Sequence, residues 1–64
     1  MIVNGVVHEN QSVRNIVELL AEMGVEPRGV AVALNGEVVR RSQWELTQIQ
    51  PSDRVEIVTA VAGG

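Results

Sequence analysis

Two Asn-Gly dipeptides, Asn4-Gly5 and Asn35-Gly36, most constrain what this chain of 64 residues can fold into. The two central residues of a type I′ hairpin turn need positive φ, and asparagine followed by glycine tolerates that conformation well. Short segments of mostly apolar residues flank both dipeptides, at residues 1–3, 6–8, 30–34 and 37–39. The sequence therefore predicts two short β-hairpins, with the second supported by the valine and alanine content of residues 30–34.

A helix is predicted between the two hairpins. Ser12 is the predicted N-cap, because its hydroxyl can accept a hydrogen bond from a free amide of the first turn. Gly24 is predicted to end the helix in the left-handed conformation that glycine tolerates. Apolar residues between these two positions follow helical spacing and predict the buried stripe, namely Val13, Ile16, Val17, Leu20 and Met23.

The last third of the chain is predicted to cross the molecule and return as a strand. Residues 40–50 have few apolar side chains and are expected to contain one short helical turn, with Trp44 as the anchor to the core. Residues 51–53 form a turn cluster, and residues 55–61 are predicted as the final strand. Within it, Val55 and Ile57 flank an outward Glu56.

These elements predict an α+β fold in one domain over residues 1–64. Two hairpins, a helix and a final strand can form a mixed sheet of about five strands, with the first and last strands paired in parallel at its centre. The main helix then covers one face of the sheet, and the right-handed crossover rule favours this path. That arrangement is the β-grasp fold, and a ferredoxin-like half-domain is the alternative that periodicity leaves open.

The amino-acid composition excludes several kinds of chemistry. Without cysteine the chain has no disulfide, no thiolate metal site and no sulfur nucleophile, so its apolar core must suffice. His8 is the only histidine and is interpreted as a surface residue. No phosphate loop, metal-ligand spacing or nucleophile–base pair is present in the sequence. We therefore expect neither a stand-alone enzyme nor a metal or cofactor bound by the chain.

The net charge and the hydropathy of the sequence limit the kinds of partner that the chain is expected to bind. The net charge is −3, and no basic run is longer than Arg40-Arg41, which argues against nucleic acid. These two arginines are interpreted as solvated surface charges. No targeting segment or membrane span is recognisable, so a cytoplasmic location without membrane contact is expected.

The carboxyl-terminal residues are the unusual feature. The predicted last strand runs through Val61 and Ala62 into Gly63-Gly64, with no charged side chain after Glu56. Two residues without Cβ atoms can extend into a narrow cleft and bring the carboxylate close to a partner's backbone or a bound nucleotide. A glycine pair also fits a frayed end. Its combination with a small β-grasp domain favours a flexible tail, residues 62–64, that is threaded into a partner.

The whole chain resembles the ThiS-type sulfur carriers of thiamin biosynthesis, within the ubiquitin-like β-grasp proteins. The resemblance lies in the two Asn-Gly hairpins, the helix, Trp44 and the ending, at residues 3–5, 17–20, 30–39, 44 and 53–64. It implies that an E1-like adenylating enzyme of the ThiF or MoeB kind activates the Gly64 carboxylate with ATP. A cysteine desulfurase would supply persulfide sulfur, and the Gly64 thiocarboxylate would donate it at a ThiG-like thiazole synthase.

Partner binding is expected to involve the tail and the free face of the sheet. The tail residues are Gly63, Ala62 and Val61, and Val58 with Ile2 are candidates for an apolar docking patch. Three alternatives stay open at this point. They are a MoaD-like carrier for molybdopterin or another pathway, a β-grasp interaction module, and a ubiquitin-like protein conjugated to lysine side chains.

Overall fold

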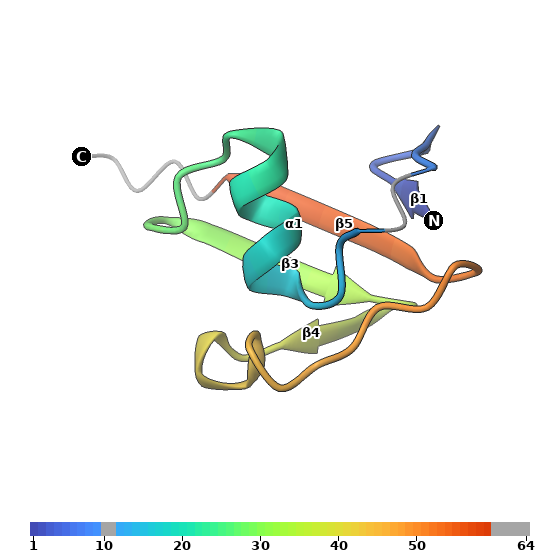
Figure 1. Ribbon diagram of the computed structural model, residues 1–64. Coiled ribbons are helices and arrows are strands. Elements are labelled where there is room, and N and C mark those ends of the chain that lie inside the picture. The colour runs from blue at the N-terminus through green and yellow to red at the C-terminus, as the bar shows by residue number, and fades with distance from the viewer. Residues whose placement is uncertain (10–11, 60–64) are drawn as a thin grey trace.

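The computed structural model describes residues 1–9 and 12–59. It contains one sheet, one α-helix and one short 3-10 helix. In chain order, the elements are β1 (Ile2–Val3), β2 (Val6–Val7), α1 (Ile16–Met23), β3 (Val30–Leu34), β4 (Glu37–Val39), η1 (Arg41–Gln43) and β5 (Arg54–Thr59). Figure 1 shows α1 lying over one face of the sheet, with β3 and β5 running beneath it.

The strand order confirms the predicted β-grasp arrangement. The sheet runs β2-β1-β5-β3-β4, which places the last strand at its centre. β1 pairs with β5 in parallel, and the other pairs are antiparallel. The ferredoxin-like alternative is not adopted, because the first and last strands, β1 and β5, pair in parallel.

Both hairpin turns form where the Asn-Gly dipeptides predict them. Asn4 and Gly5 have φ angles of 50° and 83°, and Asn35 and Gly36 have φ angles of 52° and 87°. Positive φ at both central residues is the signature of the type I′ turn, whose twist matches that of the flanking strands. The chemistry of the turn residues therefore sets the registers of the two hairpins.

The helix begins later than the sequence predicts. Its N-cap is Asn15 rather than Ser12, and the Asn15 side chain accepts a hydrogen bond from the Glu18 backbone N–H at 2.8 Å. Glu18 reaches back and accepts from the Arg14 backbone N–H at 2.9 Å. These reciprocal bonds resemble a capping box, and they satisfy donors that the helix itself cannot. The predicted end is confirmed, since Gly24 has φ 69° and its N–H donates to carbonyls of the last turn.

The core lies between α1 and the covered face of the sheet. Its buried residues are Val3, Val13, Ile16, Leu19, Leu20, Val32, Trp44, Ile49 and Val55. The predicted stripe was wrong at Val17 and Met23, which are exposed, and it omitted Leu19. A helix of only eight residues presents a narrow buried strip, so spacing alone misassigns residues at its edge.

Trp44 anchors the crossing segment, as expected. Its side chain is 4% exposed, and the indole N–H donates to the Val39 carbonyl oxygen at 2.9 Å. The Trp44 backbone carbonyl also accepts from the Ile16 N–H at 3.3 Å, so one residue ties η1 to both the sheet and the helix. The predicted short helical turn corresponds to η1.

Candidate functional site

Most of the predicted site residues lie beyond the described part of the chain. Val61, Ala62, Gly63 and Gly64 are all outside it, and β5 is described as far as Thr59. The strand begins one residue earlier than predicted, at Arg54, and its predicted last two residues are also outside. Val58 is described, and its side chain is 60% exposed.

β5, the strand that precedes the predicted site residues in the sequence, is fixed by neighbours on both sides. On one side, β1 pairs with it through Ile2↔Arg54 and Val3↔Val55. On the other side, β3 pairs with it from Leu34↔Val55 to Val30↔Thr59. The Val55 side chain is fully buried in the core. Pairing on both sides therefore fixes the position of β5 in the sheet.

Asn4 makes two further contacts with β5 that the sequence did not suggest. Its side-chain Oδ1 accepts from the Ile57 backbone N–H at 2.8 Å, and its Nδ2 donates to the Ile57 carbonyl oxygen at 3.2 Å. One side chain thereby satisfies both backbone groups of one residue. The Asn-Gly pattern predicts a turn, and it carries no signal that the same side chain bonds a strand 53 residues away.

Asn35 makes a similar contact at the other end of β5. Its Oδ1 accepts from the Arg54 N–H at 2.9 Å, and its backbone N–H donates to the Arg54 carbonyl at 2.7 Å. Its Nδ2 donates to Asp53 Oδ1 at 3.0 Å, and Asp53 Oδ2 accepts from the Gln50 N–H at 2.7 Å. The asparagines of the two hairpin turns therefore hold the central strand at its first residue, Arg54, and at Ile57.

The sheet has an uncovered face, which we call the open face. Side chains alternate along a strand and paired residues share a face, so the register assigns its members. They are Ile2, Val7, Ala31, Ala33, Val38, Arg54, Glu56 and Val58. Val38 and Val58 are 76% and 60% exposed, and only Arg54 and Glu56 are charged. Exposed valines and two charged side chains of the central strand β5 thus share this surface, and protein-binding surfaces likewise combine apolar and polar residues.

The pairing register shows on which face of the sheet Ile2 and Val58 lie, which periodicity alone could not decide. Ile2 and Val58 both lie on the open face, since Val3 and Val55 are the buried members of their strands. The alanines of β3 and Val38 of β4 join them, although the sequence offered no signal beyond strand alternation. Arg40 and Arg41 are exposed and lie at the start of η1, outside the eight residues of this face.

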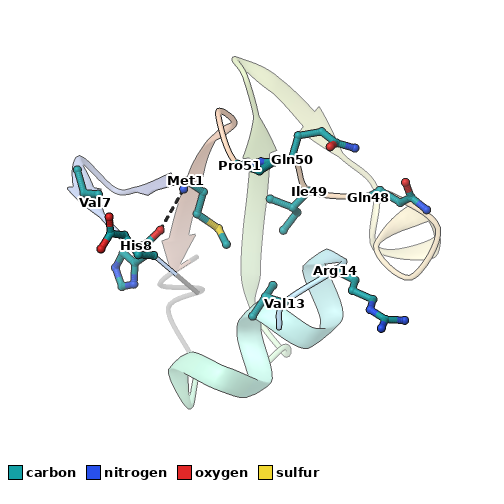
Figure 2. Close-up of a pocket in the computed structure, with 10 residues that line it drawn as sticks. Met1, Val7, His8, Val13, Arg14, Gln48, Ile49, Gln50 and Pro51 are labelled. Carbon is teal, nitrogen blue, oxygen red and sulfur yellow. Dashed lines mark hydrogen bonds between the residues drawn. The ribbon is translucent and has the colours of Figure 1, made fainter. Parts of the chain in front are cut away.

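A second feature is a hollow of about 1060 Å³ between the N-terminal hairpin, the residues before α1 and the loop that contains Ile49. Figure 2 shows Met1 and His8 on one side of it and Val13 on another. The Met1 ammonium donates to the His8 backbone carbonyl at 3.0 Å. The His8 side chain is half-buried.

Other kinds of site are not found among residues 1–9 and 12–59. No three histidine, aspartate or glutamate side chains there are grouped to hold a metal ion. No helix in that part of the chain has the length and hydropathy to cross a bilayer. No polar or charged residue in these ranges is buried. The possible site components of the described chain are therefore β5 with its two asparagine contacts, the open face and the hollow.

Comparison with known proteins identifies the family to which the chain belongs. The ThiS family model matches residues 1–64. The sulfur carrier protein ThiS of Thermus thermophilus is 39% identical over 51 residues, which are 80% of this chain and 80% of that protein. The Escherichia coli protein of the same name is 31% identical over 51 residues, covering 80% of this chain and 77% of that protein.

A thiazole synthase of Paramagnetospirillum magneticum is 33% identical over all 64 residues, and this chain spans 20% of its length. A crystal structure of a thiamine biosynthesis protein (ThiS) from Geobacter metallireducens superposes with a TM-score of 0.83 at 33% identity. It covers 98% of this chain and 96% of that one. With the family model matched along its whole length and the β-grasp topology shared, the chain belongs to the ThiS family.

Proposed function

We propose that this protein is a sulfur carrier for the synthesis of the thiamin thiazole, and that the Gly64 carboxylate is the group that carries the sulfur. The observation that supports this best is the match to the ThiS family over residues 1–64, which includes the Gly63-Gly64 ending. The protein acts as a co-substrate of other enzymes and not as a catalyst. Residues 62–64 form its tail, and residues 1–59 hold and present that tail.

The proposed chemistry begins by making the carboxylate electrophilic. A carboxylate oxygen of Gly64 attacks the α-phosphorus of ATP, and pyrophosphate leaves. The terminal sulfur of an enzyme persulfide then attacks the carbonyl carbon, and AMP leaves with its bonding electron pair. A thiol attacks the resulting acyl disulfide, becomes oxidised to a disulfide and releases the thiocarboxylate. The nucleotide site of the adenylating enzyme supplies the activation, so the carrier needs no cofactor of its own.

The partners follow from these steps. An adenylating enzyme of the ThiF or MoeB kind binds the tail first, and a cysteine desulfurase is the indirect source of the persulfide. A thiazole synthase then receives the sulfur. The Paramagnetospirillum relative supports this last partner, since a thiazole synthase contains a stretch similar to this whole chain. All these steps are placed in the cytoplasm.

The open face is the proposed docking surface for the adenylating enzyme and the synthase. Two of its valines, Val58 on β5 and Val38 on the edge strand β4, are exposed, and burying them against a partner would be favourable. Val58 lies on the same strand that leads to the tail, so a partner seated on this face is beside the tail's origin. Docking and delivery of the carboxylate are thus coupled by β5.

The proposal is tested by intact-mass measurement. The chain is incubated with ATP, an adenylating enzyme of the ThiF kind, a cysteine desulfurase, cysteine and a reducing thiol. The expected product is heavier by the difference between one sulfur and one oxygen atom, and fragmentation places the change at Gly64. A chain lacking Gly64 should fold and remain unchanged in mass. An unmodified full-length chain, where the Escherichia coli carrier is loaded under the same conditions, would overturn the proposal.

A further inference from the structure

β1 ends well before β5 does. β1 has two residues and β5 has six, and Val3, the last residue of β1, is paired with Val55. The Asn4 backbone N–H still donates to the Val55 carbonyl oxygen at 2.9 Å. The chain then turns away through Gly5, which has φ 83°. Without further contacts, β5 would lose its neighbour on this side after Val55.

The Asn4 side chain takes over the pairing at the next position. Backbone groups that point to one side of a strand belong to alternate residues, so Ile57 follows Val55 on the β1 side. There the Asn4 amide bonds both the N–H and the carbonyl oxygen of Ile57, at 2.8 and 3.2 Å. A primary amide offers one acceptor and one donor in a plane, which is what the backbone of a neighbouring strand would provide. We call this pair of bonds the Asn4 clamp.

The clamp lies at the last point where the described chain can hold β5 from this side. Thr59, the next residue whose backbone faces that side, ends the strand and is paired with Val30 on the β3 side. Loss of the clamp would leave β5 held by β3 alone from residue 56 onward. The freed residues would sample more conformations, and a partner would have to order them on binding.

We propose that Asn4 is a positioning residue for the carboxyl-terminal tail: by clamping Ile57 it sets the direction in which the chain leaves the sheet. The inference rests on the proposed function, in which that tail must enter the nucleotide site of an adenylating enzyme. Asn4 touches neither ATP nor the reacting carboxylate in this scheme. Its contribution is to lower the conformational cost of inserting the tail, which affects KM and not kcat.

Asn35 provides a matched control. Asn4→Gly and Asn35→Gly make the same change in the same kind of turn, and glycine keeps the positive φ that each position requires. Each removes an asparagine side chain that bonds β5, at Ile57 in one case and at Arg54 in the other. Both variants should lose similar stability, and only Asn4→Gly should alter the end of β5 next to the tail.

The first measurement is pyrophosphate release by the adenylating enzyme at saturating ATP and varied carrier concentration. We expect Asn4→Gly to raise KM by about fivefold or more with kcat unchanged, as the loss of one or two hydrogen bonds predicts. Asn35→Gly should keep KM within about twofold of wild type, a difference too small to reflect a lost hydrogen bond. Equal KM values for the two variants, at matched melting temperatures, would overturn the proposal.

Asn4→Asp gives a graded test if the glycine variant is too unstable. A carboxylate keeps the acceptor for the Ile57 N–H and loses the donor to the Ile57 carbonyl. Its KM should therefore lie above that of wild type, and a wild-type KM would contradict the clamp.

Amide hydrogen exchange separates the clamp from the proposed function. The Ile57 N–H should exchange about fivefold faster or more in Asn4→Gly, relative to the Val55 N–H, and should be unchanged in Asn35→Gly. Equal protection in both variants would overturn the clamp even if adenylation proceeds. Failure of every adenylating enzyme to activate the wild-type chain would instead overturn the proposed function.

Discussion

Replacing Val58 with threonine tests whether the open face is the docking surface. Threonine has nearly the shape of valine and is also β-branched, so the preference of β5 for the strand conformation is preserved. Val6 offers a matched control, because its side chain is 59% exposed and that of Val58 is 60% exposed. Val6 pairs with the buried Val3, which places it on the opposite face of the sheet.

The size of the effect follows from these exposures. A valine side chain gains about 1.5–3 kcal/mol when it is fully buried, so the exposed part of Val58 has about 1–2 kcal/mol to gain on docking. Threonine loses part of that gain and places a hydroxyl in the interface, at a further cost of about 1 kcal/mol. A total near 2 kcal/mol corresponds to a rise of about 30-fold in KM for the carrier. Both positions are largely exposed, so the free energy of unfolding should change by no more than about 0.5 kcal/mol in either variant.

The assay is adenylation of the carrier at saturating ATP, combined with urea unfolding of each variant. Val58→Thr should raise KM strongly, and Val6→Thr should leave it close to the wild-type value. Similar KM values for both variants would refute the assignment of docking to the open face. A large loss of stability in Val58→Thr would refute the exposure argument on which the magnitude depends.

Three stability predictions concern the scaffold, and each is measured by urea unfolding followed by far-ultraviolet circular dichroism. Trp44→Phe removes the indole donor to Val39 and some buried area, so the free energy of unfolding should fall by about 2–3 kcal/mol. The total for a chain of this size is roughly 3–10 kcal/mol. A loss below about 1 kcal/mol would contradict the role of Trp44 as an anchor. Asn15→Ala removes the cap on Glu18 and should cost about 1 kcal/mol, and no measurable loss would contradict a helix that begins at Ile16. Gly24→Ala should cost about 1–2 kcal/mol from backbone strain alone, since a Cβ there would meet no other atom within 4 Å; no loss would mean that the helix end is not left-handed.

The hairpins could be predicted because their determinants are local. Asn-Gly favours positive φ at two successive residues whatever surrounds it, and apolar segments on either side can pair only in the register that the turn permits. The order of elements then leaves few topologies, since a parallel pair needs a crossover and crossovers are right-handed. The strand bounds of β3 and β4 were correct to the residue for the same reason.

The helix shows where local signals compete. Ser12 and Asn15 are both good N-caps, and the choice between them depends on which turn can pack Ile16 and Leu19 into the core. The structure also uses Asn15 in an isolated bridge to Gln48, a contact between segments far apart in the sequence. Glu18 three residues after Asn15 was a usable signal for the later start, since it matches the capping-box spacing.

The sequence by itself determined the local geometry of this protein: two turns, one helix end and the strands beside the turns. It also determined the family, through residues spread along the whole chain. Only the tertiary structure decided which valines form the open face and which backbone groups the turn asparagines bind. Those properties depend on the register between strands that are distant in the sequence, and register is fixed by packing across the sheet and not by any single segment. The contact between Asn4 and Ile57 belongs to this second class, because the amide that favours the turn has a partner only when β5 lies beside β1.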